Sequence, residues 1–143
     1  MRIAVIADTH DRLPPHVREG IAGADEIWHL GDVCEPAIVD SLDSLGVPLR
    51  IVRGNCDRHP WPVTLDFVCE GFRIHLIHIP PRTAPSGVDL LLHGHTHVPR
   101  HEKLGRTLFC NPGCITRPNR GAPASYAWLD LEKGAPGWTL VPV

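Results

Sequence analysis

Short runs of apolar residues recur along the first third of the chain, separated by segments with helical spacing. Residues 2–7, 26–30 and 48–52 are rich in β-favouring residues, which is typical of strands buried on both faces. A helix is expected to open near Pro14 and Pro15, where a missing N–H is tolerated, and a second is expected over residues 35–45. This alternation predicts parallel strands joined by right-handed crossovers.

The second half of the chain has a different pattern. Residues 63–70 and 73–79 predict a hairpin around Gly71-Phe72, and residues 88–92 predict a further buried strand. The intervening segment Pro81–Gly87 is too short and too rich in proline to form a helix. Antiparallel strands broken by Gly and Pro are then expected over residues 100–104, 106–110, 125–131 and 138–141. The whole pattern favours a loop-rich α/β sandwich.

Composition narrows the class of protein. The length of 143 residues favours one compact domain over residues 1–143. With 14 Lys and Arg against 16 Asp and Glu, the net charge of −2 argues against an extended nucleic-acid surface or an anionic-membrane surface. No apolar run reaches the roughly 18 residues of a membrane span, and the odd count of five cysteines suits reduced thiols. A cytoplasmic protein is therefore expected.

Polar residues of metal-binding types come directly after the predicted strands. Because the carboxyl ends of strands in an α/β sheet meet at one crevice, five loops are expected to bring acids, an amide and imidazoles to one edge. These residues are Asp8 and His10 after the first strand, Asp32 after the second, Asn55 and Asp57 after the third, His78 at the end of the hairpin, and His95 and His97 after residues 88–92.

The chemistry of this set points to a pair of divalent ions. Carboxylate, amide oxygen and imidazole ligands together favour borderline ions such as Mn, Fe, Zn, Ni or Co. Two such ions outweigh the charges of Asp8 and Asp32, and the resulting positive centre would attract a phosphate ester and lower the pKa of a bound water. Glycines at positions 31, 54 and 94 allow the backbone to approach the ligands closely.

Each of these residues also has an ordinary structural explanation. Asp8 suits a turn, Asp32 a helix N-cap, Asn55 a left-handed turn, His78 a strand, and His95 and His97 an exposed loop. The occurrence of all of them in order, each after a strand, favours the functional interpretation.

The complete set resembles the motifs of the calcineurin-like metallophosphoesterase superfamily, and in particular its small bacterial and archaeal phosphodiesterase branch. The matching residues are Asp8-Thr9-His10, Gly31-Asp32, Gly54-Asn55-Cys56-Asp57, His78, Gly94-His95-Thr96-His97 and Asn111-Pro112-Gly113. The resemblance implies a four-layered α/β/β/α sandwich of two mixed sheets. Because Pro81–Gly87 replaces a helix that family members tend to carry, we expect a shortened outer helix layer, whose exposed sheet a homo-oligomer partner would cover.

The resemblance also implies the roles of individual residues. One divalent ion, with Mn as the first candidate, would be held by Asp8, His10 and His97. The second would be held by Asn55, His78 and His95, and Asp32 would bridge the two. The implied reaction is hydrolysis of a small phosphate ester, in the first place a phosphodiester, by in-line attack of a hydroxide that bridges the ions. The catalytic roles fall to Asn55, Asp32, His10 and Asp57, the last as a support for the Asn55 loop.

Two positions depart from the family pattern. Many members have a His where Cys56 stands, and a thiol with a reference pKa of ~8.5 is a poor proton donor to a leaving group. A diester with a good leaving group is therefore favoured over a monoester, while His59 is either a substitute donor or a solvated loop residue. The family usually has Gly after the His at position 78, whereas this chain has Ile79-Pro80, which can change the backbone approach to the second ion.

Other residues have weaker claims to function. Packing or surface exposure explains His16, His29, His75, His93 and His101. Cys110 and Cys114 are expected to be either two buried thiols or a pair of zinc ligands. Arg53 and Arg58 either contact a phosphate or are solvated, and Trp61 can line the substrate cleft. The alternatives to a phosphodiesterase are a catalytically inactive scaffold with the metallophosphoesterase fold, or a phosphomonoesterase that acts on a small phosphorylated metabolite.

Overall fold

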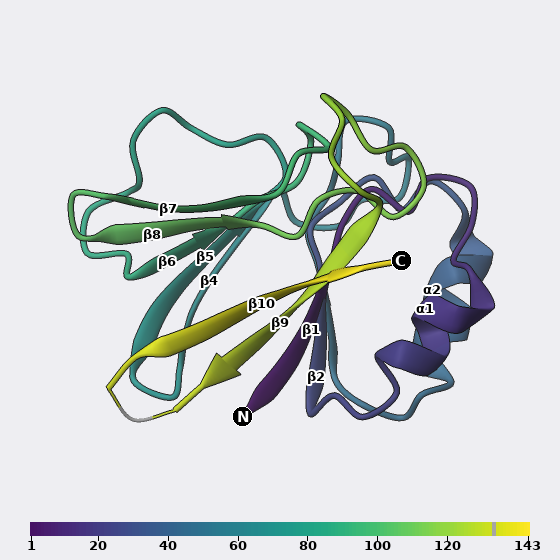
Figure 1. Ribbon diagram of the computed structural model, residues 1–143, viewed down its shortest axis with the longest axis horizontal. Coiled ribbons are helices and arrows are strands. Elements are labelled where there is room, and N and C mark those ends of the chain that lie inside the picture. The colour runs from purple at the N-terminus through teal and green to yellow at the C-terminus, as the bar shows by residue number, and fades with distance from the viewer. Residues whose placement is uncertain (133) are drawn as a thin grey trace.

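A computed structural model describes residues 1–132 and 134–143, in which two five-stranded sheets stack face to face (Figure 1). The first sheet has the order β10-β9-β1-β2-β3 and the second the order β4-β5-β6-β8-β7. The elements are β1 (Arg2–Ile6), α1 (Pro15–Gly20), β2 (Glu26–His29), α2 (Pro36–Asp43), β3 (Leu49–Ile51), β4 (Thr64–Cys69), β5 (Phe72–Ile77), β6 (Leu90–Leu92), β7 (Arg100–Leu104), β8 (Thr107–Asn111), β9 (Ser125–Leu131) and β10 (Pro136–Pro142). In the described part of the chain, no helix has the length and apolar character that crossing a membrane requires.

The first sheet confirms the predicted alternation of strands and helices. Strands β1, β2 and β3 are parallel, whereas β9 and β10 are antiparallel to their neighbours. Both helices lie on the outer face of this sheet (Figure 1). Along β1, Ile3 and Val5 pack into the core between the sheets, while Ala4 and Ile6 pack under the helices. Strand β1 is therefore buried on both faces, as its unbroken apolar sequence predicted.

The second sheet is also mixed, but its outer face carries no helix among the described residues. Strand β6 pairs in parallel with β5 and β8, and β4 and β7 add antiparallel edges. The segment Pro81–Gly87 is irregular, as its prolines predicted, and Ala84 packs on an outer apolar cluster of Val88, Leu91 and Phe109. The α/β sandwich of two mixed sheets is confirmed, and the outer layer that the sequence predicted to be shortened is a loop.

The hairpin between β4 and β5 turns one residue earlier than the sequence indicated. Glu70 and Gly71 have φ values of 49° and 83°, and Cys69 pairs directly with Phe72. Two consecutive left-handed residues are typical of the tight turn that matches the twist of antiparallel strands. Phe72 consequently belongs to β5 and packs against the core between the sheets.

Candidate metal centre

All seven predicted metal ligands come from loops that follow β1, β2, β3, β5 and β6, and their polar atoms meet at one edge of the two sheets. One group of contacts joins the first and last loops of this series. Asp8 Oδ1 lies 3.3 Å from His97 Nε2, and His10 Nε2 also lies 3.3 Å from His97 Nε2. The fold thus brings His97 to His10, which lies 87 positions earlier in the sequence, and to Asp8, which lies 89 positions earlier. The topology of an α/β sheet predicts this meeting of loops.

A second group of contacts lies beside the first. His78 Nε2 is 3.3 Å from Asp32 Oδ2 and 2.9 Å from Asn55 Oδ1. Asn55 Oδ1 is in turn 3.1 Å from His95 Nδ1. The distance of 3.9 Å between His78 Nε2 and Asp8 Oδ1 connects the two groups. The Ile79-Pro80 sequence after His78 has therefore not moved its imidazole away from the other predicted ligands.

The loops that carry these residues turn sharply where the strands end. Five of the seven have left-handed backbone conformations, with φ between 51° and 69°. These residues are Asp8, His10, Asp32, His95 and His97. Left-handed backbone costs free energy in residues other than glycine, and such strain is concentrated at functional sites. The strain here keeps the side chains aimed at one another instead of along the strands.

Two imidazoles are oriented by hydrogen bonds to backbone carbonyls. The Nδ1 atom of His78 lies 2.7 Å from the carbonyl oxygen of Leu30, and Nδ1 of His97 lies 2.6 Å from that of Arg117. A carbonyl only accepts, so each Nδ1 carries a proton, and Nε2 is the atom that the neutral ring offers to a metal ion. In both rings Nε2 is the atom that faces the carboxylates, which is how a histidine is prepared to ligate a metal ion.

The two carboxylates of the site have opposite electrostatic environments. Burial raises the pKa of Asp8 from 3.8 to about 6, although the nearby His78 and His97 oppose the shift. Burial acts in the same direction on Asp32, but hydrogen bonds from His78 and from the Cys56 N–H outweigh it and lower the pKa to about 2. Near neutral pH both carboxylates are ionised, and both are almost completely buried.

One carboxylate oxygen of Asp8 is buried without a hydrogen-bond partner among the described residues. The Oδ2 atom of Asp8 accepts a hydrogen bond from the His95 N–H, whereas the buried Oδ1 atom accepts none from the residues that the structure describes. A buried carboxylate oxygen without a hydrogen bond is costly unless a cation compensates for it. Asp8, Asp32 and His78 each offer a ligand atom within 4.8 Å of the others, so the residues present fit a divalent ion.

The Asp57 carboxylate supports the site through hydrogen bonds to the backbone of the loops that carry the predicted ligands. Its Oδ2 accepts hydrogen bonds from the backbone N–H groups of Asp32 and Gly54, at 2.9 and 2.7 Å. Its Oδ1 accepts a third from the N–H of Cys34, at 2.9 Å. This one buried carboxylate therefore links the loop after β2 to the loop after β3.

Glycines provide the space in which the carboxylates sit. A Cβ atom at Gly94 would lie 2.8 Å from Asp8 Oδ2, and one at Gly54 would meet the Asp32 carboxylate and backbone nitrogen. Gly31 combines a φ of 95° with a Cβ position 2.7 Å from His78 Nδ1. All three glycines that the sequence singled out therefore permit close backbone approach.

His29 has a role that its position inside a predicted strand did not indicate. Its Nε2 atom lies 2.9 Å from Thr9 Oγ1, and its Nδ1 accepts a hydrogen bond from the Gly31 N–H at 3.2 Å. Burial lowers the pKa of this imidazole to about 4, so it is neutral at neutral pH. His29 joins the loops after β1 and β2, and the only signal in the sequence was its place two residues before Gly31-Asp32.

The other histidines, cysteines and arginines to which the sequence assigned alternative roles lie away from the two groups of contacts or at their margin. His16 and His101 are exposed, and buried His75 pairs with Asp66 at 2.7 Å. All five cysteines are free thiols, and Cys110 and Cys114 are both buried. The Arg53 and Arg58 side chains are exposed near the Asn55 loop.

Two cavities flank the cluster of predicted ligands. One of about 450 Å³ is lined by residues that include Cys34, Cys56 and Trp61, whose indole lies 4.5 Å from the His59 ring. The other, of about 530 Å³, adjoins His95 and includes His93, Arg100 and Arg120 in its lining. Asn55 and His95 are exposed, so these two predicted ligands are open to solvent, and Asn55 lines a further cavity of about 290 Å³ together with His78.

Comparison with known proteins places this arrangement in context. Residues 1–134 match the family model described as a calcineurin-like phosphoesterase superfamily domain. A probable metallophosphoesterase from Methanothermobacter thermautotrophicus is 36% identical over 153 residues, which cover 93% of this chain and 88% of that protein. The phosphodiesterase YfcE of Escherichia coli is 30% identical over 163 residues, covering 92% of this chain and 89% of that protein.

Solved structures agree with the sequence matches. The structure of YfcE, described as a phosphoesterase, superimposes with a TM-score of 0.79 over 91% of this chain and 88% of that one. Vps29 of Chaetomium thermophilum reaches a TM-score of 0.80 at 20% identity, over 100% of this chain and 95% of that one. At that level of identity the likeness to Vps29 concerns the fold alone.

Proposed function

The chain belongs to the calcineurin-like phosphoesterase superfamily of metal-dependent phosphoric ester hydrolases, and from this we propose that it is a phosphodiesterase with a dinuclear metal centre. The proposal goes beyond family membership in two respects, the number of ions and the preference for a diester. We treat residues 1–143 as one metallophosphoesterase domain.

The single observation that carries the proposal is the buried Oδ1 atom of Asp8, which has no hydrogen-bond partner among the described residues and lies near two imidazoles and a second carboxylate. In the assignment we propose, Asp8, His10 and His97 hold one divalent ion, and Asn55, His78 and His95 hold the other. Asp32 bridges them. The two groups of short contacts support this division, because each contains the three residues assigned to one ion.

When bound, divalent ions supply positive charge for the phosphoryl oxygens and lower the pKa of a water molecule. The protein contributes positioning and further charge stabilisation. Asn55 presents its Oδ1 to the imidazoles, which leaves its Nδ2 available as a hydrogen-bond donor to a phosphoryl oxygen. Asp57 acts as a positioning residue, because it holds the backbone of Asp32 and Gly54 without touching the substrate position.

The preference for a diester rests on Cys56. Burial and the neighbouring Asp32 raise the pKa of this thiol above its ordinary value, so it releases a proton poorly near neutral pH. A phosphodiester with a good leaving group needs less help from a general acid than a monoester does. YfcE, which is 30% identical to this chain, is named a phosphodiesterase and supports the same preference. The relative from Methanothermobacter thermautotrophicus is named a probable metallophosphoesterase, which supports the broader reaction class.

We further propose Mn²⁺ as the first ion to test, followed by Ni²⁺, Fe²⁺, Zn²⁺ and Co²⁺, because imidazole and carboxylate ligands suit all of these ions. A cytoplasmic setting fits the five free thiols, since disulfides are rare there. The helix-free outer face of the second sheet is the surface on which a second copy of the chain would pack, which light scattering can test.

The direct test is hydrolysis of an activated phosphodiester, bis-p-nitrophenyl phosphate, by purified protein with added Mn²⁺. The Asp32→Asn variant removes the proposed bridging carboxylate, and Asp43→Asn, on the exposed face of α2, is the matched control. We expect Mn²⁺-dependent turnover by the parent and the control, and a loss of at least roughly a hundredfold in Asp32→Asn. Elemental analysis should find close to two ions per chain, which an inactive scaffold would not require.

Equal rates in the parent and in Asp32→Asn would contradict the proposal. Faster turnover of the matched monoester, p-nitrophenyl phosphate, would retain the hydrolase but overturn the preference for a diester. Binding of only one ion at saturating Mn²⁺ would overturn the dinuclear assignment.

A further inference from the structure

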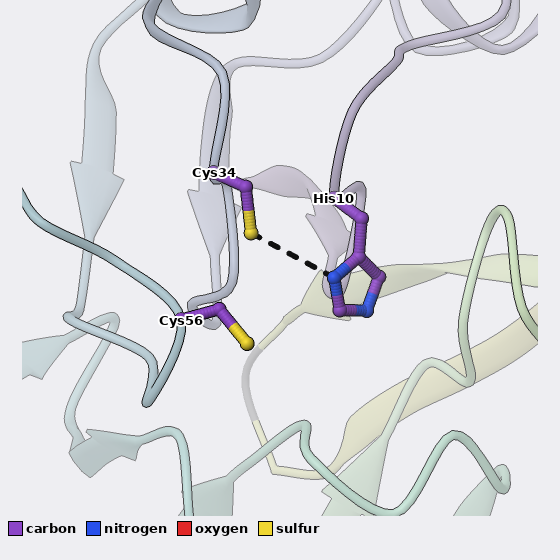
Figure 2. Close-up of side chains that lie close together, drawn as sticks. All are labelled: His10, Cys34 and Cys56. Carbon is purple, nitrogen blue, oxygen red and sulfur yellow. Dashed lines mark hydrogen bonds between the residues drawn. The ribbon is translucent and has the colours of Figure 1, made fainter.

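A cluster of two thiols and an imidazole lies directly beside the proposed centre (Figure 2). It consists of His10, Cys34 and Cys56, which come from the loops after β1, β2 and β3. The Sγ atom of Cys34 is 3.7 Å from Nδ1 of His10, and the three residues each offer a ligand atom within 4.8 Å of the others. In Figure 2 the Cys34 sulfur points toward the His10 ring, and the Cys56 sulfur lies on the same side of the ring but is turned below it.

The backbone holds both cysteines in place. The Cys34 N–H donates a hydrogen bond to Asp57 Oδ1, and the Cys56 N–H donates one to Asp32 Oδ1, both at 2.9 Å. Cys34 also has a left-handed backbone, with φ of 62°. Two thiols on different loops are therefore anchored by buried carboxylates and held within 4.8 Å of one imidazole.

The ligands of this cluster differ in chemistry from those of the proposed phosphoesterase centre. The latter offers oxygen and nitrogen, whereas the cluster offers two sulfur atoms and one nitrogen. Two cysteines with one histidine are a known zinc donor set, in which a water completes the tetrahedron. Cys56 is exposed and lines the cavity of about 450 Å³, so both an ion and that water can reach the cluster from solvent.

We propose that His10, Cys34 and Cys56 form a second binding site, which shares His10 with the phosphoesterase centre and takes one thiophilic divalent ion, such as Zn²⁺ or Cd²⁺. Binding forms two metal–sulfur bonds and one bond to His10 Nδ1, and it releases the two thiol protons to solvent. No oxidant or other reactant is required. The carboxylates of Asp57 and Asp32, which accept hydrogen bonds from the N–H groups of Cys34 and Cys56, place negative charge beside this position, and that charge favours a cation.

Occupation of this site opposes the phosphoesterase reaction through His10. A neutral imidazole has one nitrogen lone pair, and the proposed centre needs that of Nε2, which faces His97 at 3.3 Å. An ion at Nδ1 takes the lone pair there and leaves the proton on Nε2. His10 is then lost as a ligand of the Mn²⁺ centre, so a thiophilic ion inhibits the enzyme. This consequence rests on the proposed function, whereas binding itself does not.

The binding test uses metal-free, fully reduced protein and Cd²⁺ as the probe, because sulfur-to-cadmium charge-transfer absorption in the ultraviolet reports only sulfur ligands. We expect one equivalent of Cd²⁺ to produce this absorption in the parent. Cys34→Ser and Cys56→Ser should each weaken the binding at least roughly tenfold. Cys69→Ser, whose thiol contacts Met1 and not the site, is the matched control and should leave it unchanged.

Cys114→Ser separates this site from another arrangement, because Cys114 also lies within reach of His10 and His97. In the present structure its thiol already donates to the Asp8 carbonyl and accepts from the Arg117 N–H. We therefore expect Cys114→Ser to retain the absorption. The proposed site is wrong if Cys114→Ser is the variant that loses the absorption while Cys34→Ser and Cys56→Ser keep it. It is also wrong if the parent shows no such absorption.

The inhibition test titrates Zn²⁺ into Mn²⁺-loaded protein, with each variant compared with its own uninhibited rate. The Zn²⁺ concentration that halves the rate should rise at least roughly tenfold in Cys34→Ser and stay unchanged in Cys69→Ser. Equal inhibition of all variants would overturn the antagonism. If the parent hydrolyses no phosphodiester, the proposed function fails, and the Cd²⁺ absorption still decides whether the thiophilic site exists.

Discussion

The carboxylate of Asp57 accepts a hydrogen bond at 2.9 Å from the backbone N–H of Asp32, a residue that lies 25 positions earlier in the chain. The same carboxylate also accepts from the N–H groups of Gly54 and Cys34. Hydrogen bonds to an ionised acceptor are stronger than neutral ones, and here three of them converge on one buried group. The position of the proposed bridging ligand Asp32 therefore depends on Asp57.

Replacing this carboxylate by an amide tests that dependence. In Asp57→Asn, an NH₂ group faces at least one backbone N–H donor, so that donor is left without an acceptor. We expect a loss of about 1–3 kcal/mol in the free energy of unfolding and a ten- to hundredfold loss of Mn²⁺ affinity, as an order of magnitude. Chemical denaturation and calorimetric titration measure the two quantities. Unchanged Mn²⁺ affinity would show that Asp57 supports the fold but not the site.

A glycine at position 54 leaves room for the Asp32 carboxylate. In Gly54→Ala the new Cβ would meet Asp32 Oδ1 and lie 2.8 Å from its Cγ, so the carboxylate must move. Gly23→Ala is the matched control, because nothing lies within 4 Å of its Cβ position. We expect Gly54→Ala to lose at least roughly tenfold in Mn²⁺ affinity, while Gly23→Ala binds as the parent does. Equal affinities in the two variants would contradict the close approach.

The raised pKa of Asp8 predicts how the stability of the metal-free protein depends on pH. The pKa is 3.8 in the unfolded chain and about 6 in the fold, so the folded protein binds this proton more tightly. Asp8 by itself therefore lowers the free energy of unfolding as pH rises from about 4 to about 6, by about 2–3 kcal/mol. His29 and His93, whose pKa values burial lowers to about 4, raise it over the same range. Asp32 also acts in the opposite sense to Asp8 but at lower pH, because its pKa is lowered to about 2.

Denaturation of metal-free protein across this pH range measures the effect. Asp8→Asn has nearly the same shape but no proton to lose, so it lacks the decrease that Asp8 contributes. The free energy of unfolding of the parent minus that of the variant should therefore fall between about pH 4 and about pH 6. Saturating Mn²⁺ should abolish the decrease that Asp8 contributes in the parent, because the ion stabilises the ionised carboxylate. A difference between parent and Asp8→Asn that stays constant or rises over this range would show that the pKa of Asp8 is not raised in the fold.

Much of the fold could be predicted because its signals are local. The unbroken apolar sequence of β1 indicated a strand buried on both faces, and the prolines of Pro81–Gly87 excluded a helix there. Strand ends were predicted less well, since the pairing of Cys69 with Phe72 is decided by the partner strand. The local sequence contains no information about that partner.

The candidate site could be predicted in part for a topological reason. Once parallel strands are recognised, residues such as Asp8 and Asn55 must approach one another at the carboxyl edge. The contacts of His29 with Thr9 and of His10 with Cys34 could not be predicted, because they depend on how neighbouring loops pack. A histidine inside a strand and a cysteine two residues before a helix are ordinary features of a sequence.

Cys56 offers a test of why this chain should prefer diesters. It occupies the position at which many family members carry a histidine, and its thiol is a weaker acid than an imidazolium. In Cys56→His, a group that titrates near neutral pH can protonate the leaving oxygen, which matters most for monoesters with poor leaving groups. We expect the ratio of monoester to diester turnover to rise roughly tenfold or more, with a bell-shaped pH profile for the monoester. Cys56→Ser, which adds no such acid, is the control and should keep the parent's ratio. If both variants change the ratio equally, access to the cavity beside Trp61, and not proton donation, determines which ester is hydrolysed.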